Sequence, residues 1–394
     1  MNRQEQIALL KRLLRHVEGK TTDLADAPWR NDVSVYTDPD HLARERHILF
    51  RQHPLLMGLA TEWAEPGAFR TDDYAGLPIL IARGRDHRLR AFLNVCRHRG
   101  AKVAQGCGRA RAFACPYHAW SYDLAGKLMG IPDERAFPGV RAERGSLTEL
   151  PLCEKHGLVW VIPTPSASAS TVFDIDPWLG GLGPELAGYD FASWSFFDKR
   201  VVPESMNWKL LVDTFHEGYH IGFLHKQSLG GILHGNVTDF SAFGPNHRLT
   251  VPRQKLERLK AEPEDTWDLM WNTTLIYSLF PNTLLLVQGD HVELARIFPA
   301  DRVDRAVMDL ALYVPKAPTT EAERMHWDKN MQLVLDVVTG EDFPAGRTIQ
   351  MGLASGAQTH TVYGRNEPAM IHYHQAMRAA LGAEERAPRR AAAE

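Results

Sequence analysis

The sequence predicts an α+β protein in which a mostly β domain precedes a domain with strands and helices in separate blocks. Its 394 residues exceed the length of one typical domain. Residues 47–163 contain short apolar runs broken by Gly, Pro and Asp, a pattern typical of β structure. After a stretch rich in Pro, Ser and Ala at 163–171, both apolar runs and long helical periodicities occur.

The expected segments follow from these changes in composition and hydrophobic periodicity. They are a helical arm (1–46), the β domain (47–163), a linker (164–171), the α+β domain (172–382) and a disordered tail (383–394). In the β domain we expect strands at 77–82, 89–94 and 158–162. In the second domain we expect helices at 208–224, 320–338 and 367–381, and strands at 274–279, 283–288 and 306–314.

Composition narrows the class of protein. The chain has 44% hydrophobic and 24% charged residues and a net charge of −3, so nothing favours nucleic acid or an anionic membrane as a partner. The first 20 residues form an amphipathic helix that is too charged for a signal peptide. No run of about eighteen apolar residues occurs, and four cysteines argue against a disulfide framework. We expect a cytoplasmic protein.

Two short motifs in the β domain each pair a cysteine with a histidine. Cys96 and His98 form the first, and Cys115 and His118 form the second, with sixteen residues between the two motifs. Tetrahedral zinc is one interpretation, but zinc fingers usually take both cysteines from one motif and both histidines from the other. Here each motif supplies one cysteine and one histidine. This arrangement suits a [2Fe–2S] cluster with thiolates on one iron and imidazoles on the other. We therefore favour the mixed-ligand cluster.

With its flanking residues, this region resembles the Rieske domain of the ring-hydroxylating oxygenase family. The resemblance covers about residues 50–160, including the segments 94–100 and 115–120. Respiratory Rieske proteins carry a further cysteine in each motif, whereas positions 101 and 117 are Ala and Tyr here. The resemblance is therefore to the oxygenase branch or its small ferredoxins, and it implies one [2Fe–2S] cluster. The remaining cysteines, Cys107 and Cys153, are expected to be buried or half-buried and without chemistry.

A second group of polar residues lies in segment 207–225. On an ideal helix Asp213, Glu217 and His220 form one stripe, and a buried stripe of this kind must be paired or metal-bound. His220 and His225 lie about 140° apart around such a helix, so both reach one metal only if the helix breaks, as Gly222 permits. Two imidazoles and a carboxylate with open positions are typical of non-haem Fe(II) oxygenases.

This segment also resembles the oxygenase family, whose catalytic domain is an antiparallel sheet with helices of the helix-grip type. The resemblance implies one mononuclear Fe(II) held by His220 and His225. Glu217 takes the place of the carboxylate that links the cluster histidine of a neighbouring subunit to the iron histidine. That carboxylate is usually Asp, and Glu is notable among oxygenases acting on quaternary amines. Asp213 stands where the family often has Asn close to the iron, and we expect it to support the ligands from behind.

The third iron ligand is expected far away in sequence. The family typically has an acidic residue eight positions before a Gln that opens a Gln-x-Gly-Leu segment, and Asp342 stands at that distance from Gln350. Glu341 and then Asp336 are the alternatives. Spacing alone does not select among them, and the pair 341–342 also suits a solvated helix end.

The resemblance implies a terminal oxygenase that hydroxylates a small, aromatic substrate with O₂, by mono- or dioxygenation. Electrons would come from NAD(P)H through a separate reductase, with or without a ferredoxin, and the assembly would be a homotrimer or a multiple of it, with or without a β subunit. Oxidative N- or O-demethylation, including that of quaternary amines, is the alternative. A pure electron carrier is a third, disfavoured because it needs no two-histidine site. We expect the substrate pocket to come from segments 215–224, 232–243 and 277–287.

Overall fold

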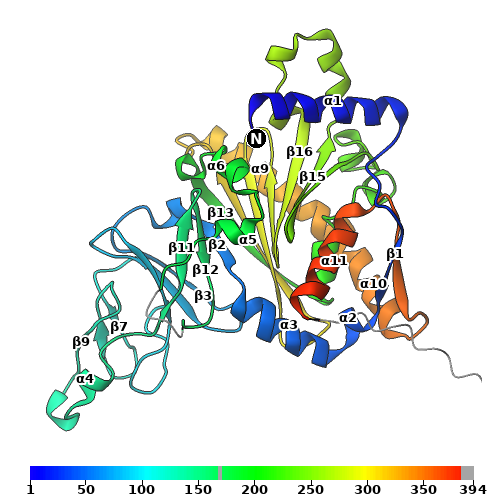
Figure 1. Cartoon of the computed structure of the whole chain (residues 1–394). Coiled ribbons are helices and arrows are strands. Elements are labelled where there is room, and N and C mark those ends of the chain that lie inside the picture. Colours follow the sequence, from blue (N-terminus) through cyan, green and yellow to red (C-terminus); the bar gives the residue numbers. More distant parts are fainter. Residues whose placement is uncertain (167–170, 383–394) are drawn as a thin grey trace, which may run out of the picture.

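A computed structural model of the chain describes residues 1–166 and 171–382. The part that carries the two Cys/His motifs is built from short antiparallel strands and lies at the left of Figure 1. Its strands are β2 (Leu55–Leu59), β3 (Ala68–Asp72), β4 (Ile79–Arg83), β5 (Leu89–Leu93), β6 (Cys107–Arg109), β7 (Phe113–Ala114), β8 (Ser121–Tyr122), β9 (Leu128–Gly130), β10 (Glu149–Leu150), β11 (Leu152–Lys155) and β12 (Leu158–Val161). They pair in the orders β10-β5-β4-β3-β6, β11-β12-β2 and β7-β8-β9.

A seven-stranded antiparallel sheet forms the centre of the rest of the chain. Its order is β13-β19-β18-β17-β16-β15-β14, so that six strands follow one another as a meander and β13 closes the far edge. The strands are β13 (Ser195–Glu204), β14 (Asp239–Phe243), β15 (Asn246–Pro252), β16 (Thr273–Leu279), β17 (Thr283–Val287), β18 (Val292–Pro299) and β19 (Ala306–Val314). The expected strands at 274–279, 283–288 and 306–314 are confirmed to within one residue at each end.

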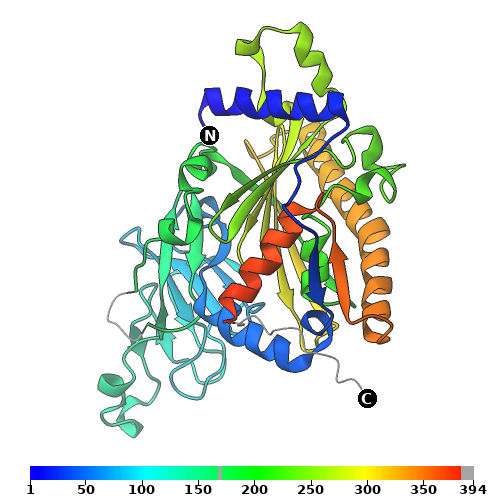
Figure 2. The same cartoon turned by 45° about the vertical axis from the view of Figure 1, so that its right-hand side comes forward.

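Helices cover both faces of this sheet, as Figures 1 and 2 show. The α-helices of the described residues are α1 (Arg3–Gly19), α2 (Ser34–Thr37), α3 (Pro39–Gln52), α4 (Val140–Glu143), α5 (Asp176–Leu179), α6 (Gly183–Ala187), α7 (Trp208–Asp213), α8 (Leu269–Asn272), α9 (Glu321–Val337), α10 (Phe343–Ala354) and α11 (Pro368–Ala380). The helices expected at 320–338 and 367–381 are confirmed as α9 and α11. No helix among the described residues is both long and apolar enough to cross a membrane.

The alternation of side chains along the sheet produces two separate cores. Ile276 and Leu286 point to the face on which α7, α10 and α11 pack, and they belong to the same core as Trp208. Their neighbours Leu275 and Leu285 point to the opposite face, where they join a core that includes α1. The first face is the one that lines the cavity described below.

The N-terminal segment packs along the second domain instead of standing free. Asn2 caps α1 by accepting the backbone N–H of Glu5, and the apolar stripe of α1 packs at one end of the large sheet (Figure 2). That stripe consists of Leu9, Leu10, Leu13 and Leu14. Further on, β1 (Trp29–Asp32) pairs with β20 (His360–Tyr363), which joins the two ends of the chain. The boundaries given above for the arm, the linker and the two domains stay predictions, and the expected tail lies outside the described residues.

The helix expected over 208–224 is wrong in extent. Asn207 caps the start of α7, but the helix ends at Asp213, and only a short 3₁₀ turn (His220–Gly222) follows. The Glu217 carboxylate accepts the backbone N–H groups of Tyr219 and His220, so it caps a new turn instead of continuing the old helix. The predicted stripe of three residues on one helix therefore does not exist.

Candidate functional site

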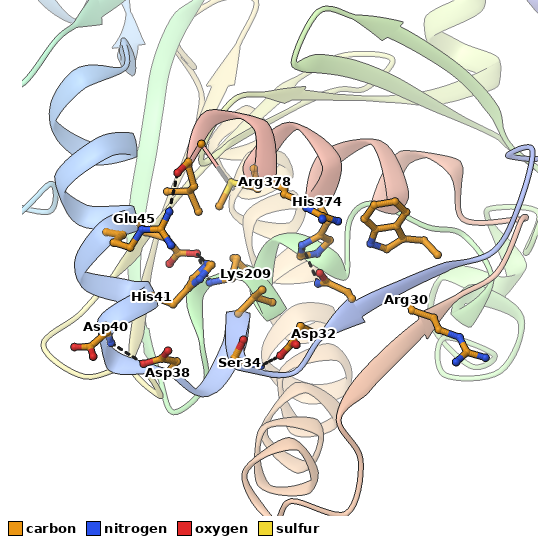
Figure 3. A pocket seen from close by; sticks show the side chains of 17 residues that line it. Arg30, Asp32, Ser34, Asp38, Asp40, His41, Glu45, Lys209, His374 and Arg378 are labelled. Carbon is orange, nitrogen blue, oxygen red and sulfur yellow. Dashed lines mark hydrogen bonds and ion pairs between the residues drawn. The ribbon is translucent and has the colours of Figure 1, made fainter. Parts of the chain in front are cut away.

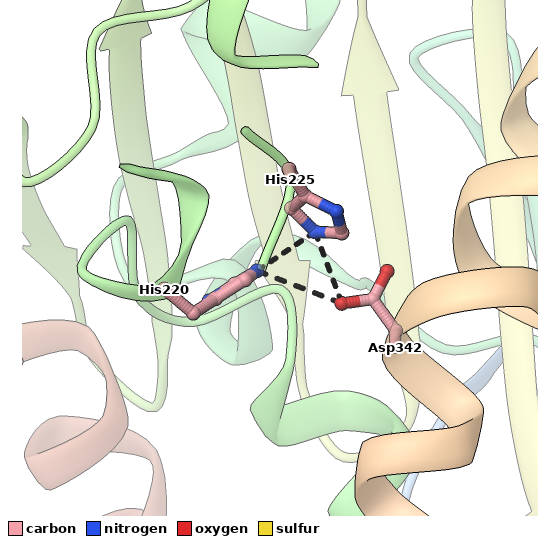
Figure 4. A group of neighbouring side chains, drawn as sticks. All are labelled: His220, His225 and Asp342. Carbon is pink, nitrogen blue, oxygen red and sulfur yellow. Dashed lines mark hydrogen bonds and ion pairs between the residues drawn. The ribbon is translucent and has the colours of Figure 1, made fainter. Parts of the chain in front are cut away.

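Three potential metal-ligand atoms meet beside the large sheet (Figure 4). The Nε2 atoms of His220 and His225 lie 3.1 Å apart. Asp342 Oδ1 lies 3.1 Å from His225 Nε2 and 3.6 Å from His220 Nε2. Separations of this size allow all three atoms to reach one ion at about 2 Å. The structure thus brings together the three residues that the sequence proposed as ligands.

The other nitrogen of each imidazole is held by a carboxylate. His220 Nδ1 donates to Glu217, and His225 Nδ1 lies 2.6 Å from Glu341 Oε2 and donates to it. A neutral ring that donates from Nδ1 presents a lone pair at Nε2. Both Nε2 lone pairs therefore face the same point as Asp342 Oδ1, and three electron-rich atoms at this spacing repel one another unless a cation lies between them.

Two further observations fit a cation at this point. Asp342 Oδ1 is buried and makes no hydrogen bond within the described residues, and an unpaired buried carboxylate oxygen is costly. Burial opposes a positive charge on His225, but the carboxylates of Asp342 and Glu341 outweigh it and raise its pKa overall. Two imidazoles and one carboxylate, with one side open, form the ligand set typical of non-haem Fe(II). The residues fit the metal, and their role as ligands stays a prediction.

A π-helical turn (Val338–Asp342) between α9 and α10 presents both acidic residues to His225. π turns widen a helix locally and occur frequently at functional sites. Asp342 reaches the Nε2 side of the imidazole, and Glu341 reaches the Nδ1 side. The third candidate, Asp336, is exposed on α9 and accepts a hydrogen bond from Gln332. Of the three alternatives, only Asp342 lies among the three converging atoms.

Asp213 has different partners from those expected. Its carboxylate accepts a hydrogen bond of 2.6 Å from the Tyr36 hydroxyl and lies 2.9 Å from His374 Nε2. Within the described residues it makes no hydrogen bond to His220 or His225. Asp213 therefore belongs to a buried network behind the site, and its support of the ligands stays a prediction.

The three converging residues line a cavity of about 320 Å³. The predicted segments contribute to it through Phe215, Ile221, Leu233 and Leu286. Sequence reasoning missed the wall formed by α9 and the charged end of the cavity. That end is formed by Arg253, Gln288, Asp290, His291 and Glu293. The sequence signal for it is the polar stretch 288–293, which covers the turn after β17 and the first two residues of β18.

A second, larger cavity of about 840 Å³ lies between β1, α3 and α11 (Figure 3). Its wall contains the buried ion pair between Lys209 and Glu45, at 2.6 Å. The Glu45 carboxylate also accepts the Trp208 indole N–H at 2.8 Å. Burial opposes the charge of Glu45, but Lys209 and His41 lower its pKa overall. The buried charges of Lys209 and Glu45 thus compensate each other. We infer that this pair stabilises the fold.

The two Cys/His motifs form loops with matching backbones. In each loop the cysteine N–H donates to the carbonyl five residues later, and the cysteine carbonyl accepts the N–H four residues later. The fourth residue has a positive φ in both, at Gly100 (85°) and Ala119 (56°). The four hydrogen bonds are Cys96–Ala101, Gly100–Cys96, Cys115–Trp120 and Ala119–Cys115, at 2.8, 2.9, 2.9 and 2.9 Å. Two buried thiols are thereby held in equivalent positions.

The imidazoles of the two motifs lie next to each other. The ring centres of His98 and His118 are 4.7 Å apart, and His98 stacks on Trp120. His98 Nδ1 is buried without a partner in the described structure, and the Tyr122 hydroxyl lies 3.4 Å from Cys96 Sγ. Each loop thus contributes one buried thiol and one imidazole, as a two-iron cluster with mixed ligands requires.

The two remaining cysteines differ from each other. Cys153 is buried, as expected, and burial raises the pKa of its thiol. The expectation is wrong for Cys107, which is exposed. The reason is its place on β6, a strand of three exposed residues at the edge of the five-stranded sheet.

Comparison with known families gives the class of protein. Residues 55–150 match the model of the Rieske [2Fe–2S] domain, and residues 191–383 match the ring hydroxylating alpha subunit (catalytic domain). The chain belongs to the family of Rieske oxygenase alpha subunits. The predicted α+β architecture and the predicted cofactors, one [2Fe–2S] cluster and one mononuclear iron, are confirmed at this level.

Proteins similar to this chain are named for two kinds of substrate, quaternary amines and aromatic hydrocarbons. The chain is 30% identical over 223 residues to a glycine betaine monooxygenase oxygenase subunit of Chromohalobacter salexigens, covering 56% of this chain and 48% of that protein. It is 32% identical over 232 residues to biphenyl 2,3-dioxygenase subunit alpha of Rhodococcus jostii, covering 55% and 47%. The chain thus spans about half the length of these two relatives. The carnitine monooxygenase oxygenase subunit of Escherichia coli is 26% identical, and 83% of this chain matches 85% of it.

Solved structures share the fold. A quaternary ammonium Rieske monooxygenase in complex with L-carnitine superposes with a TM-score of 0.75 at 21% identity, covering 91% of this chain and 96% of that one. Naphthalene 1,2-dioxygenase from Rhodococcus sp. superposes with a TM-score of 0.73 at 18% identity, covering 96% and 98%. At these identities the likeness is one of fold.

Proposed function

We propose that the chain is the terminal oxygenase of a Rieske system, which inserts oxygen from O₂ into a small organic substrate. The observation that carries this proposal is the convergence of His220 Nε2, His225 Nε2 and Asp342 Oδ1 in the wall of a cavity. A pure electron carrier has no use for such a site. Electrons from NAD(P)H would reach the cluster through a separate reductase, with or without a ferredoxin.

In this proposal His220, His225 and Asp342 hold the mononuclear iron. When bound, that iron supplies the redox chemistry that activates O₂. Glu217 and Glu341 keep the Nδ1 protons in place, so that both Nε2 atoms remain available as ligands. The apolar walls of the cavity orient the substrate and exclude water from the reacting carbon.

We propose that Cys96, His98, Cys115 and His118 hold the cluster, and that electrons enter the iron site from another subunit through Glu217. Within one chain, β7 and β9 lie on the opposite side of the large sheet from α10 in Figure 1. Exposed apolar side chains stand beside both sites, at Tyr117 and Phe223, 60% and 75% exposed. A related structure is described with inter-subunit electron transfer. We therefore retain the homotrimer, or a multiple of it, as a proposal.

For the substrate we favour a small quaternary amine over an aromatic hydrocarbon, which reverses the order expected from the sequence. The carnitine monooxygenase subunit matches most of this chain, and the glycine betaine monooxygenase subunit is likewise named for a quaternary amine substrate. The cavity itself carries Arg253, which forms no ion pair among the described residues. A guanidinium facing a hydrocarbon would lose its hydration without compensation, whereas an amine substrate that also carries a negative charge compensates it. Glu217 agrees with this choice, because glutamate at this position is notable among family members that act on quaternary amines, whereas most members have Asp.

Iron analysis tests the proposal. Purified wild type should contain about three irons per chain and, when reduced, give the electron paramagnetic resonance signal of a mixed-ligand cluster. His220→Ala should lose about one iron and keep the cluster signal. His47→Ala, which removes an exposed histidine, should retain all three. Two irons in both wild type and His220→Ala would reduce the chain to an electron carrier.

A further inference from the structure

The charged end of the cavity contains an arginine that has no acidic partner. Arg253 follows β15 and lines the cavity. Its Nη2 donates to Gln288 Oε1 at 2.8 Å, and its Nε donates to the Thr273 carbonyl at 3.4 Å. Among the described residues no carboxylate forms an ion pair with it. Burial lowers its pKa, which means that the protein environment alone does not fully compensate the guanidinium charge.

The nearby carboxylates are already paired with another cation. His291 Nδ1 lies 2.8 Å from Asp290, and its Nε2 lies 3.1 Å from Glu293. Burial opposes a charge on His291, but these two carboxylates outweigh it and raise its pKa to about 9. The imidazole is therefore protonated at neutral pH and occupies both carboxylates. Asp290 and Glu293 act on Arg253 only from a distance.

Gln288 adds a second oriented donor. Its Oε1 accepts hydrogen bonds from Arg253 and from the Thr274 hydroxyl, the latter at 3.0 Å. Since arginine only donates, this contact identifies the oxygen of the amide, and the Nε2 group must point elsewhere. Within the described structure neither Gln288 Nε2 nor Arg253 Nη1 makes a hydrogen bond. Two N–H donor groups on adjacent side chains, one of them charged, are the arrangement that binds a carboxylate.

We propose that Arg253 and Gln288 bind the carboxylate of the substrate, which is therefore a small organic acid or a zwitterion. This inference rests on the proposed function, because it takes the cavity that His220, His225 and Asp342 also line as the substrate site. A volume of about 320 Å³ suits a small molecule. Ile276 and Leu286 line the same cavity and offer apolar surface to the body of the ligand.

Direct binding tests the proposal without using activity. Isothermal titration of the purified, metal-loaded protein compares two pairs of probes, each a carboxylate and its alcohol counterpart: benzoate with benzyl alcohol, and trimethylglycine with choline. We expect at least one carboxylate to bind about tenfold or more tightly than its alcohol, since a hydrogen bond to a charged group contributes roughly 1.5–3 kcal/mol. Arg253→Gln should remove this preference and leave alcohol binding unchanged. Arg258→Gln, an exposed arginine outside the cavity, should behave as wild type.

A second variant keeps the test decisive if Arg253→Gln folds poorly. Gln288→Glu places a carboxylate beside Arg253, so it should raise the melting temperature and abolish carboxylate binding. Equal affinity for carboxylates and alcohols, no binding of either carboxylate, or a preference that survives both variants would overturn the proposal. Failure of the proposed function is distinct, because it appears as missing iron in the analysis above while carboxylate binding at Arg253 can persist.

Discussion

Glu341 and Asp342 are neighbours in the chain, yet they contact opposite ring nitrogens of the same histidine, His225. Glu341 accepts from Nδ1 at 2.6 Å, and Asp342 Oδ1 lies 3.1 Å from Nε2. The π-helical turn (Val338–Asp342) makes this possible, because it alters the angle between successive side chains. One turn of backbone thus supplies both a proposed ligand and the group that fixes the tautomer of a second proposed ligand.

This relationship predicts different losses for the two acids. Asp342→Asn should abolish tight iron binding, because it removes a charged ligand atom. Glu341→Gln should weaken iron binding only about 10- to 100-fold, since it disturbs the orientation and basicity of His225. Asp336→Asn, the exposed acid of α9, is the control and should change nothing. Competition with a chelator measures all three, and equal losses for the first two variants would contradict these roles.

Glu217 should matter for electron delivery beyond its effect on the metal. With iron loaded fully, Glu217→Gln should slow the single-turnover oxidation of the reduced cluster more than tenfold, because the proposed route to His220 passes through its carboxylate. Glu341→Gln is the matched control, since it supports a histidine in the same way and lies off the route. If stopped-flow absorbance gives the same rate for both variants, Glu217 is only a support for His220.

The His291 imidazole should make stability depend on pH. Its pKa is raised to about 9 in the folded protein, against about 6.5 in an unfolded chain. The stabilisation is therefore complete below about pH 6.5 and disappears as pH rises through 9. The difference in free energy of unfolding between wild type and His291→Gln should be largest at pH 6 and small at pH 10, as urea titrations can measure. A difference that stays constant over this range would refute the assignment.

The buried pair of Lys209 and Glu45 should be essential for folding. Lys209→Met leaves the Glu45 charge buried without its main partner, which should cost about 3–5 kcal/mol. The double variant Glu45→Gln/Lys209→Met should recover much of this loss. Lys102→Met is the control, because Lys102 and Asp73 form an exposed pair whose loss should cost at most about 1 kcal/mol. Thermal or urea unfolding compares them, and equal effects of the two lysine substitutions would contradict the burial argument.

Local motifs explain what could be predicted from the sequence. Within each Cys/His motif, and within the His220/His225 pair, the two residues lie only a few positions apart, so local spacing could suggest them as candidates before the family resemblance was considered. Asp342 needed the family resemblance, because it lies more than a hundred positions away. The π turn left no trace in the hydrophobic pattern, since it depends on backbone hydrogen bonds. The extent of the helix over 208–224 was wrong because the Glu217 side chain competes for backbone donors.

The charged end of the cavity was missed for a different reason. Arg253, Thr274 and Gln288 come from the ends of three strands and meet only through the register of the sheet. Each of them alone looks like an ordinary polar residue at a strand end. Only a prediction that included the correct register of the three strands would have placed these residues side by side.

Diffraction at the iron absorption edge is the most direct test of the central claim. Crystals of the purified protein should show three anomalous peaks per chain, two between the loops of Cys96 and Cys115 and one among His220, His225 and Asp342. A missing third peak, or a third peak bound by other residues, would contradict the assignment of an oxygenase site.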